Sequence, residues 1–390
     1  PAGLLSLPPV RYVGRISYSW YLWHWPAIVF ATVWLSGLST PLLLLVVALS
    51  WIPAALTHRL VEERFRRAPA FAPTGAAMRL GTACTATSVA LGAVAWAAVP
   101  VVPLAGAGQV AGAAALNKDG PFPQRSADAL RPVPRDATQD KGRAHDAGCL
   151  VSKRATTSGD CVFGDPSSST TAVLFGDSHA IQYAPAMDRI AKRHGWRLVV
   201  LTKSGCTPAE VSTFDPQLRR EYSECDTWRS RALKRIEKAE PALVVTGNRA
   251  TTRTVGPDGK MNAGDSAAAL RDGYVKTLRR LEQTGAQVVT IADNPHPRED
   301  VPACVSKSMD DLPACSFDED HGLYFERVGR EAAAKVPGVH LVDPTPVLCQ
   351  DGTCPAVIGN ALVYRNGAHL TATYAGTLTD WLDDRLPDDV

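Results

Sequence analysis

The hydrophobic pattern divides the chain into two unlike parts. Residues 16–57 and 80–117 contain no Asp, Glu, Lys or Arg, whereas charged residues are spread throughout the region after Lys118. A helix needs roughly 20 apolar residues to cross a hydrocarbon core of about 30 Å, and three stretches approach or reach that length. The sequence therefore predicts three membrane-spanning helices, at about 16–38, 41–57 and 80–104.

Basic residues predict how these helices are oriented. The segment between the second and third stretches is rich in arginine, two arginines precede the first stretch, and the short loop "SGLST" between the first two carries no charge. By the positive-inside rule, the N-terminal end and the arginine-rich loop lie in the cytoplasm. We therefore expect a multi-pass membrane protein, in contact with the lipid bilayer, whose chain after residue 105 is extracytoplasmic.

The exported part begins with a segment that has no sustained apolar period. Residues 105–148 are rich in Ala, Gly and Pro with mixed charge. Such a composition is typical of segments that bury too little apolar surface to become ordered. The sequence predicts a flexible extracytoplasmic linker over 105–148.

From residue 149 to 390, short runs of β-forming residues alternate with helical patterns. Apolar runs flanked by helices are typical of strands covered on both faces of a parallel sheet, so we predict an α/β domain with a doubly wound parallel sheet. In such sheets the site lies in the crevice beyond the carboxyl ends of the strands. The expected strands are residues 171–176, 197–202, 242–247, 287–292 and 339–343.

Cysteines support export. Eight of the nine cysteines lie in this second part, an even number that suits disulfides in an oxidising compartment. No CxxC pair or clustered Cys/His spacing favours zinc, so we expect no metal site. Pairing nearest neighbours gives Cys149 with Cys161, Cys206 with Cys225, Cys304 with Cys315, and Cys349 with Cys354.

Charge and chain start limit the class of protein further. A net charge of +2, without a basic tract interleaved with aromatic residues, argues against a nucleic-acid partner. The chain opens with Pro1 rather than Met, which indicates a fragment of a longer protein.

The candidate chemistry centres on Ser178, in "FGDSHA" between an expected strand and helix. Serine there is either a helix N-cap or a nucleophile beside free backbone N–H groups. A nucleophile needs a base, and His369 in "NGAHLT" precedes the last helix. The N–H of Gly205 in "KSGC" and the side chain of Asn248 in "TGN" are candidate oxyanion donors.

These four blocks occur in the order found in SGNH hydrolases. The exported part resembles the SGNH domain fused to membrane acyltransferases of the acyltransferase 3 (AT3) family. The stretches "RYVGRISYSWYLWHWP" and "HRLVEERFRR" are similar to the last part of that family's membrane domain. The resemblance implies a flavodoxin-like SGNH domain over 149–390, with residues 1–104 as the C-terminal part of the membrane domain.

The resemblance also implies a function. Similar proteins O-acylate, most often O-acetylate, cell-surface polysaccharides, peptidoglycan or secreted glycosides at the bacterial plasma membrane. Ser178 then matches the nucleophile, His369 the general base, and Gly205 and Asn248 the oxyanion donors. We expect no bound cofactor, a carbohydrate acceptor, and an acyl donor derived from acyl-CoA through the membrane half that this chain does not contain.

One position departs from the family pattern. The family usually has Asp three residues before the histidine, as D-x-x-H, and this sequence has Asn366. An amide oxygen can accept from the imidazole but gives no charge to stabilise the imidazolium. Three explanations follow: a weaker serine–histidine dyad, a carboxylate recruited from elsewhere such as Asp343, or a domain that binds glycan without turnover. A carbohydrate esterase that removes acetyl groups is the rival activity.

Two further histidines lie near these blocks. We expect His179, one residue round the helix from Ser178, to be a wall of the site rather than the base. His296, in "DNPHPRED", either lines the mouth of the site or lies in a solvated turn.

Overall fold

The computed structural model describes residues 3, 6–35, 38–69, 73–97, 101–117, 122–256, 266–297, 299–323, 327–388 and 390. They form two compact units, Pro1–Pro100 and Val101–Val390, which are described separately. Parts of the expected spans, at 36–37 and 98–100, and residues 118–121 of the expected linker lie outside the described residues.

The first unit is helical. Its elements are α2 (Pro8–Trp34), α3 (Thr40–Leu49), α4 (Trp51–Thr57), a π-helical turn η1 (His58–Glu62), α5 (Glu63–Arg67) and α6 (Thr74–Ala97). Prolines at the first turns of α2 and α3 suit positions where an N–H has no helical partner. The indole of Trp20 in α2 donates to Ser50 Oγ at 2.9 Å, which ties α2 to the end of α3.

Two helices of the described chain are long and apolar enough to cross a membrane, Thr40–Arg66 and Thr74–Ala97. They contain most of the expected second and third spans. The expected first span falls in α2, which does not qualify, because its Trp and Tyr residues, His24 and Pro26 lower its mean hydropathy. The prediction of three spans is therefore supported for two.

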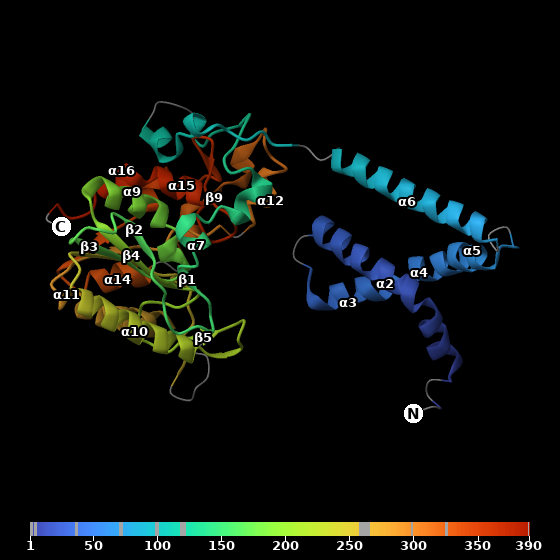
Figure 1. The fold of residues 1–390 in the computed structure, drawn as a ribbon, viewed down its shortest axis with the longest axis horizontal. Helices are drawn as coiled ribbons and strands as arrows, with labels where there is room; N and C mark the ends of the chain where they lie inside the picture. Colours follow the sequence, from blue (N-terminus) through green and yellow to red (C-terminus); the bar gives the residue numbers. More distant parts are fainter. Residues whose placement is uncertain are drawn as a thin grey trace. The chain divides into compact units, whose positions relative to one another are not determined.

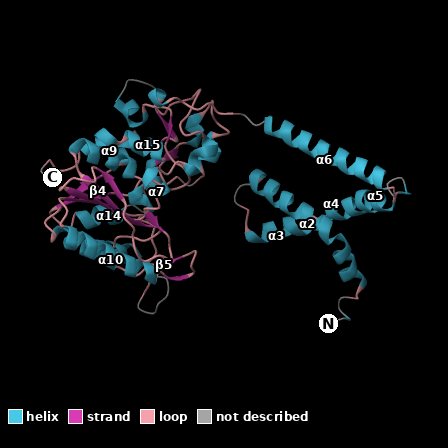
Figure 2. Ribbon diagram, viewed as in Figure 1, coloured by secondary structure: helices cyan, strands magenta, loops and turns pink. Residues whose placement is uncertain are grey.

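The second unit is built on a mainly parallel sheet with helices on both sides (Figure 2). Its strands lie in the order β1-β4-β3-β7-β8-β10, all neighbours parallel, and β2 pairs antiparallel with β4. From β4 to β10 this is the flavodoxin-like order, with the switch point between β3 and β7. The strands are β1 (Leu150–Val151), β2 (Val162–Gly164), β3 (Thr171–Gly176), β4 (Arg197–Lys203), β7 (Leu243–Gly247), β8 (Gln287–Ile291) and β10 (Val339–Val342).

Alternate residues of each strand feed two hydrophobic cores. In β3, Ala172 and Leu174 belong to one core, and Val173 and Phe175 to the other. Figure 1 shows α9, α15 and α16 on one side of the sheet and α10, α11 and α14 on the other. Their bounds are α8 (Ser178–Ile181), α9 (Ala184–His194), α10 (Ser223–Ala239), α11 (Ser266–Glu282), α14 (Arg327–Ala333), α15 (Ala372–Thr377) and α16 (Thr379–Asp383).

The prediction of a flexible linker over 105–148 is wrong for its described residues, which are part of the second unit. Leu130, Val133 and Ala137 are buried there, and the amide of Ala111 donates to the carbonyl of Gly359 at 2.9 Å. The segment has no apolar period because it packs as short turns against surfaces supplied by distant residues. Its elements are η3 (Ala107–Gln109), η4 (Gly112–Asn117), η5 (Pro134–Gln139) and α7 (Arg143–Asp146).

All four expected disulfides are present, joining Cys149 to Cys161, Cys206 to Cys225, Cys304 to Cys315 and Cys349 to Cys354. They close short loops, with sequence separations of 5 to 19 residues. The remaining small elements are β5 (Phe214–Asp215), β6 (Arg220–Glu221), α12 (Val301–Val305), η6 (Leu312–Cys315), β9 (Phe317–Asp318), α13 (Glu319–Gly322), η7 (Thr345–Val347), β11 (Thr353–Cys354), β12 (Val357–Ile358) and β13 (Ala361–Leu362).

Candidate active site

Ser178 is the first residue of α8, directly beyond β3. Gly176 has φ +152°, and a Cβ there would lie 2.1 Å from the carbonyl oxygen of Gly247, so only glycine lets β3 and β7 end this close together. The N-cap is Asp177, whose buried carboxylate accepts from the amide of His179 at 2.8 Å. The serine hydroxyl is therefore not the cap, and it is free for another role.

The hydroxyl meets the expected histidine. His369 Nε2 lies 2.9 Å from Ser178 Oγ, although 191 residues separate them. Ser178 is partly exposed, so a substrate can approach its oxygen. This pair lies at the carboxyl end of β3, next to the switch point of the sheet.

Asn366 orients the ring of His369. Its Oδ1 accepts from the amides of Ala368 at 3.0 Å and His369 at 2.9 Å, which fixes the oxygen toward the loop. The same oxygen lies 3.2 Å from His369 Nδ1, so Nδ1 carries the hydrogen and Nε2 has the lone pair that faces Ser178. Asn366 thus sets the tautomer that a general base requires.

The charge balance keeps His369 neutral. Burial, together with the positive charges of His179, Arg365 and Arg249, lowers the pKa of His369 to about 2, and the Asp293 carboxylate opposes this. A neutral imidazole can accept a proton from serine, but its imidazolium is poorly stabilised here.

The two expected oxyanion donors follow the neighbours of β3. Gly205 comes after β4 in a left-handed conformation (φ +61°), and Asn248 comes directly after β7. The side-chain Nδ2 of Asn248 donates to the backbone carbonyl of Arg249 at 3.2 Å. Within the described chain neither group bonds to Ser178 or His369, so their role as oxyanion donors stays a prediction.

Asp343 does not support His369. Its carboxylate forms an ion pair with Arg330, with Nη2 to Oδ1 at 2.7 Å, and accepts from the amide of Thr345 at 2.9 Å. The hypothesis that Asp343 is recruited in place of the missing carboxylate is therefore wrong, because His369 Nδ1 lies against Asn366 Oδ1 while the Asp343 carboxylate bonds Arg330 and Thr345.

A different carboxylate, Asp293, lies in the site just beyond β8. It accepts from His179 Nδ1 at 2.6 Å and from His296 Nε2 at 2.9 Å. Burial alone would raise the pKa of Asp293, but the two imidazoles lower it below its ordinary value, so the group is charged. In turn, although burial favours neutral His179, the Asp293 carboxylate raises the pKa of His179.

The three histidine rings lie in a row. The centroid of His179 is 4.6 Å from that of His369 and 5.2 Å from that of His296, on which it stacks. His179 is therefore a wall of the site, as its position in the sequence indicated. Ligand atoms of His179, Asp293 and His296 lie within 4.8 Å of one another and could in principle hold a metal ion, but hydrogen bonds to Asp293 already occupy Nδ1 of His179 and Nε2 of His296.

Two buried side-chain amides bond the backbone on either side of His369. The Asn294 side chain donates to the carbonyl of Ala368 at 2.9 Å, and the amide of Leu370 donates to Gln182 Oε1 at 3.0 Å. Gln182 and Asn294 also bond each other at 2.8 Å. Nothing in the local sequence pattern indicated these partnerships.

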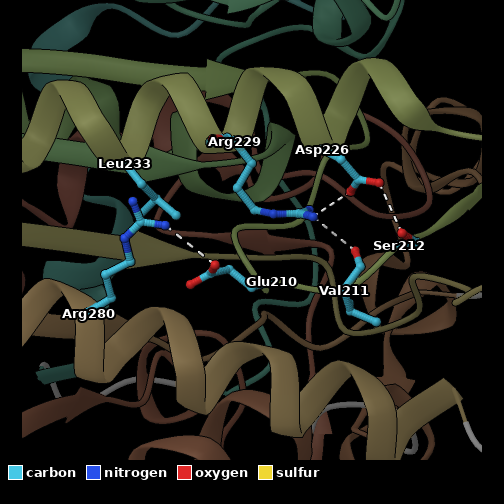
Figure 3. A pocket seen from close by; sticks show the side chains of 8 residues that line it. Glu210, Val211, Ser212, Asp226, Arg229, Leu233 and Arg280 are labelled. Atoms are coloured by element: carbon cyan, nitrogen blue, oxygen red, sulfur yellow. Dashed lines mark hydrogen bonds and ion pairs between the residues drawn. The ribbon is translucent and has the colours of Figure 1, made fainter.

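A hollow of about 340 Å³ lies between α10 and α11 (Figure 3). Its charged groups bond one another: Arg229 pairs with Asp226 and donates to the carbonyl of Val211 at 3.1 Å, and Arg280 bonds Glu210 at 3.4 Å. Since these groups already have partners, the hollow is not the candidate site.

A serine–histidine pair at the carboxyl edge of a doubly wound sheet is the arrangement of a serine esterase or acyltransferase. Residues 148–383 match the family described as "SGNH domain (fused to AT3 domains)", and because this is more than half of the chain, the chain belongs to that family. The match begins at residue 148, so the likeness of residues 1–104 to the AT3 membrane domain stays a prediction.

The other comparisons found solved structures only. The periplasmic domain of a lipopolysaccharide acetyltransferase from Salmonella ser. Paratyphi A is 16% identical, with 62% of this chain and 87% of that chain covered and a TM-score of 0.44. A GDSL-like lipase from Bacteroides thetaiotaomicron is 13% identical, with 55% and 87% covered and a TM-score of 0.32. A search of curated proteins found no match.

Proposed function

We propose that this chain transfers an acyl group, in the simplest case acetyl, to a hydroxyl of an extracytoplasmic glycan through an ester of Ser178. The observation that carries the proposal is the contact of 2.9 Å between Ser178 Oγ and a neutral His369 in a chain of the SGNH family. The donor would derive from acyl-CoA and reach Ser178 through an AT3 membrane domain.

The chemistry follows from the tautomer that Asn366 sets. Ser178 Oγ attacks the acyl carbonyl carbon while His369 Nε2 takes its proton, and the imidazolium then returns that proton to the leaving group. In the second half, an acceptor hydroxyl gives its proton to His369 and attacks the ester carbonyl. Ser178 leaves and regains the proton, so the enzyme returns to its starting state.

A hollow of about 260 Å³ beside the His369 loop is our candidate for the acceptor. Its lining residue Glu299 lies beside the His369 loop, because a Cβ on Gly367 would lie 3.4 Å from the carbonyl oxygen of Glu299. An aromatic ring with two carboxylates and one hydroxyl around it suits a sugar, which offers both an apolar face and hydrogen-bond donors. Its walls include Pro297, Glu299, Ser316, Phe317, Asp318 and His321.

Two features support a place at the membrane. The helices Thr40–Arg66 and Thr74–Ala97 are apolar enough to span a bilayer, and large apolar side chains such as Trp96 are exposed on them. The four disulfides suit an oxidising compartment outside the cytoplasm. The SGNH domain of this proposal therefore faces the cell exterior or periplasm.

The test separates transfer from hydrolysis. The purified full chain in detergent is given nitrophenyl acetate with and without unacetylated cell-wall glycan, and acetylated glycan and free acetate are both measured. We expect acetyl on the glycan and an acetyl ester on Ser178 detectable by mass spectrometry, both absent in Ser178→Ala. Release of free acetate only, and removal of acetyl from acetylated glycan, would instead identify an esterase.

A further inference from the structure

The negative charge missing at position 366 is present elsewhere in the site, on Asp293. Its side chain is 1% exposed and all four of its contacts are donors. Oδ1 accepts from His179 Nδ1 at 2.6 Å and the amide of Asn294 at 3.0 Å, while Oδ2 accepts from His296 Nε2 at 2.9 Å and the amide of Ala250 at 2.8 Å. The backbone therefore fixes the carboxylate, and the carboxylate fixes two rings.

Among the described residues the His179 ring has one side-chain hydrogen bond, to Asp293. His179 is 2% exposed, and its Nε2 has no hydrogen-bond partner among the described residues. Its bond to Asp293 therefore sets the angle of the ring about the Cβ–Cγ bond. That ring lies against His369 with an interplanar angle of 48° and follows Ser178 directly in the chain.

His369 itself is weakly held at its Nδ1. The contact with Asn366 Oδ1 is 3.2 Å, at the long end of the hydrogen-bond range, and the acceptor is neutral. Charged acceptors form shorter and stronger bonds. The face of His369 packed on His179 is therefore the second restraint on the ring that must reach Ser178.

We propose that Asp293 is a positioning residue for the Ser178–His369 pair: by fixing the His179 ring it holds His369 in place, the task that the family resemblance assigns to a carboxylate at position 366. The inference rests on the proposed Ser178 chemistry. It is supported by the charge of the Asp293 carboxylate, which opposes the lowering of the pKa of His369.

A double-mutant cycle tests this. The kcat/KM for nitrophenyl acetate is measured for the full chain, Asp293→Asn, Asn366→Asp and the double variant. We expect Asp293→Asn to lose activity on the order of 100-fold, the effect of misplacing a catalytic group by about 1 Å. In the Asn366→Asp background the loss should be much smaller, because the new carboxylate holds His369 directly.

A purely structural role for Asp293 predicts something else, namely the same factor of loss in both backgrounds, and that result would overturn the inference. Unchanged activity of Asp293→Asn would overturn it too. The matched control is Asp343→Asn, which removes a carboxylate that follows β10 and bonds Arg330, and should keep activity. Thermal unfolding checks that each variant folds.

A second variant covers the case in which Asp293→Asn does not fold. His179→Phe keeps a ring against His369 but cannot bond Asp293, and we expect the same pattern of losses in the two backgrounds. Covalent labelling of Ser178 by a fluorophosphonate separates the hypotheses. A parent chain that neither labels nor cleaves ester refutes the proposed function and the inference with it, whereas an active parent with additive variants refutes the inference alone.

Discussion

Two buried imidazoles lie side by side in this site, and their partners give them opposite properties. His369 bonds the neutral amide of Asn366, and burial with nearby positive charges lowers its pKa to about 2. His179 bonds the Asp293 carboxylate, which raises the pKa of His179 although burial opposes this. The ring that faces the nucleophile is kept as a free base, and the ring behind it is the one that is firmly anchored. The partner of each Nδ1, rather than depth of burial, makes the difference.

The largest effect is expected when one of the two imidazoles, that of His369, is removed. His369→Ala should lower kcat/KM for a nitrophenyl ester by on the order of 10⁴-fold or more, since the base and nucleophile act as a unit. Ser178→Ala should cost as much, and the double variant little more. Steady-state ester cleavage measures this, and a loss of less than tenfold in His369→Ala would contradict the assignment of the base.

The next effect makes the two imidazoles alike. Asn366→Asp gives His369 a charged partner and should raise kcat/KM for ester cleavage at least about tenfold, less than the roughly 10⁴-fold that separates the two residues in a serine protease triad. The gain is limited because the surroundings hold three positive groups that act on His369. Equal or lower activity in folded Asn366→Asp would show that the neutral partner is not the limiting feature.

The pH dependence of ester cleavage should also respond to the substitution Asn366→Asp. Catalysis needs neutral His369, and a pKa lowered to about 2 by burial and nearby charge keeps the ring neutral throughout the range in which the protein is handled. We therefore expect kcat/KM to show no loss attributable to this group between about pH 8 and pH 5. The new carboxylate in Asn366→Asp raises the pKa of His369. The acidic limb of the kcat/KM profile of this variant should therefore lie about 1 to 3 pH units higher than that of the wild type. A wild-type limb near the ordinary histidine pKa would contradict the low value.

The smallest expected effect concerns the chain on either side of His369. Gln182→Ala leaves the amide of Leu370 without its acceptor and Asn294 Oδ1 without its donor, at a cost of about 1 to 3 kcal/mol of unfolding free energy. Ester cleavage should fall less than in His369→Ala, because the Asp293–His179 contact is untouched. Chemical denaturation and kcat/KM together measure this, and a loss of activity as large as that of His369→Ala would show that these hydrogen bonds are themselves essential.

Local patterns in the sequence are enough to predict much of this architecture. The apolar runs predict the strands, and pairing neighbouring cysteines predicts the four disulfides. Two short sequence blocks identify Ser178 and His369. Asn366 is only three residues from His369, so its contact is also local. By contrast, 114 residues separate His179 from Asp293, and 112 separate Gln182 from Asn294. These pairs meet only because β3 and β8 end at the same edge of the sheet.

Two predictions differ in outcome: the flexible linker is wrong for the described residues of 105–148, and the first span is not supported by the hydropathy of α2. Residues 105–148 lack a period because they fit surfaces supplied by other segments, such as Gly359, and such fits leave no repeating signal. The first expected span was identified from the absence of charge, whereas hydropathy also counts its tryptophans, tyrosines and His24.

The cap that Asp177 supplies to α8 separates folding from reactivity at this turn. Because Asp177 caps the helix, the Ser178 hydroxyl is not needed to hold the turn between β3 and α8. A substitution of Ser178 should therefore leave this turn intact. An alanine at that position should therefore give an intact but chemically silent protein, suited to capturing the donor and acceptor that the active form would consume.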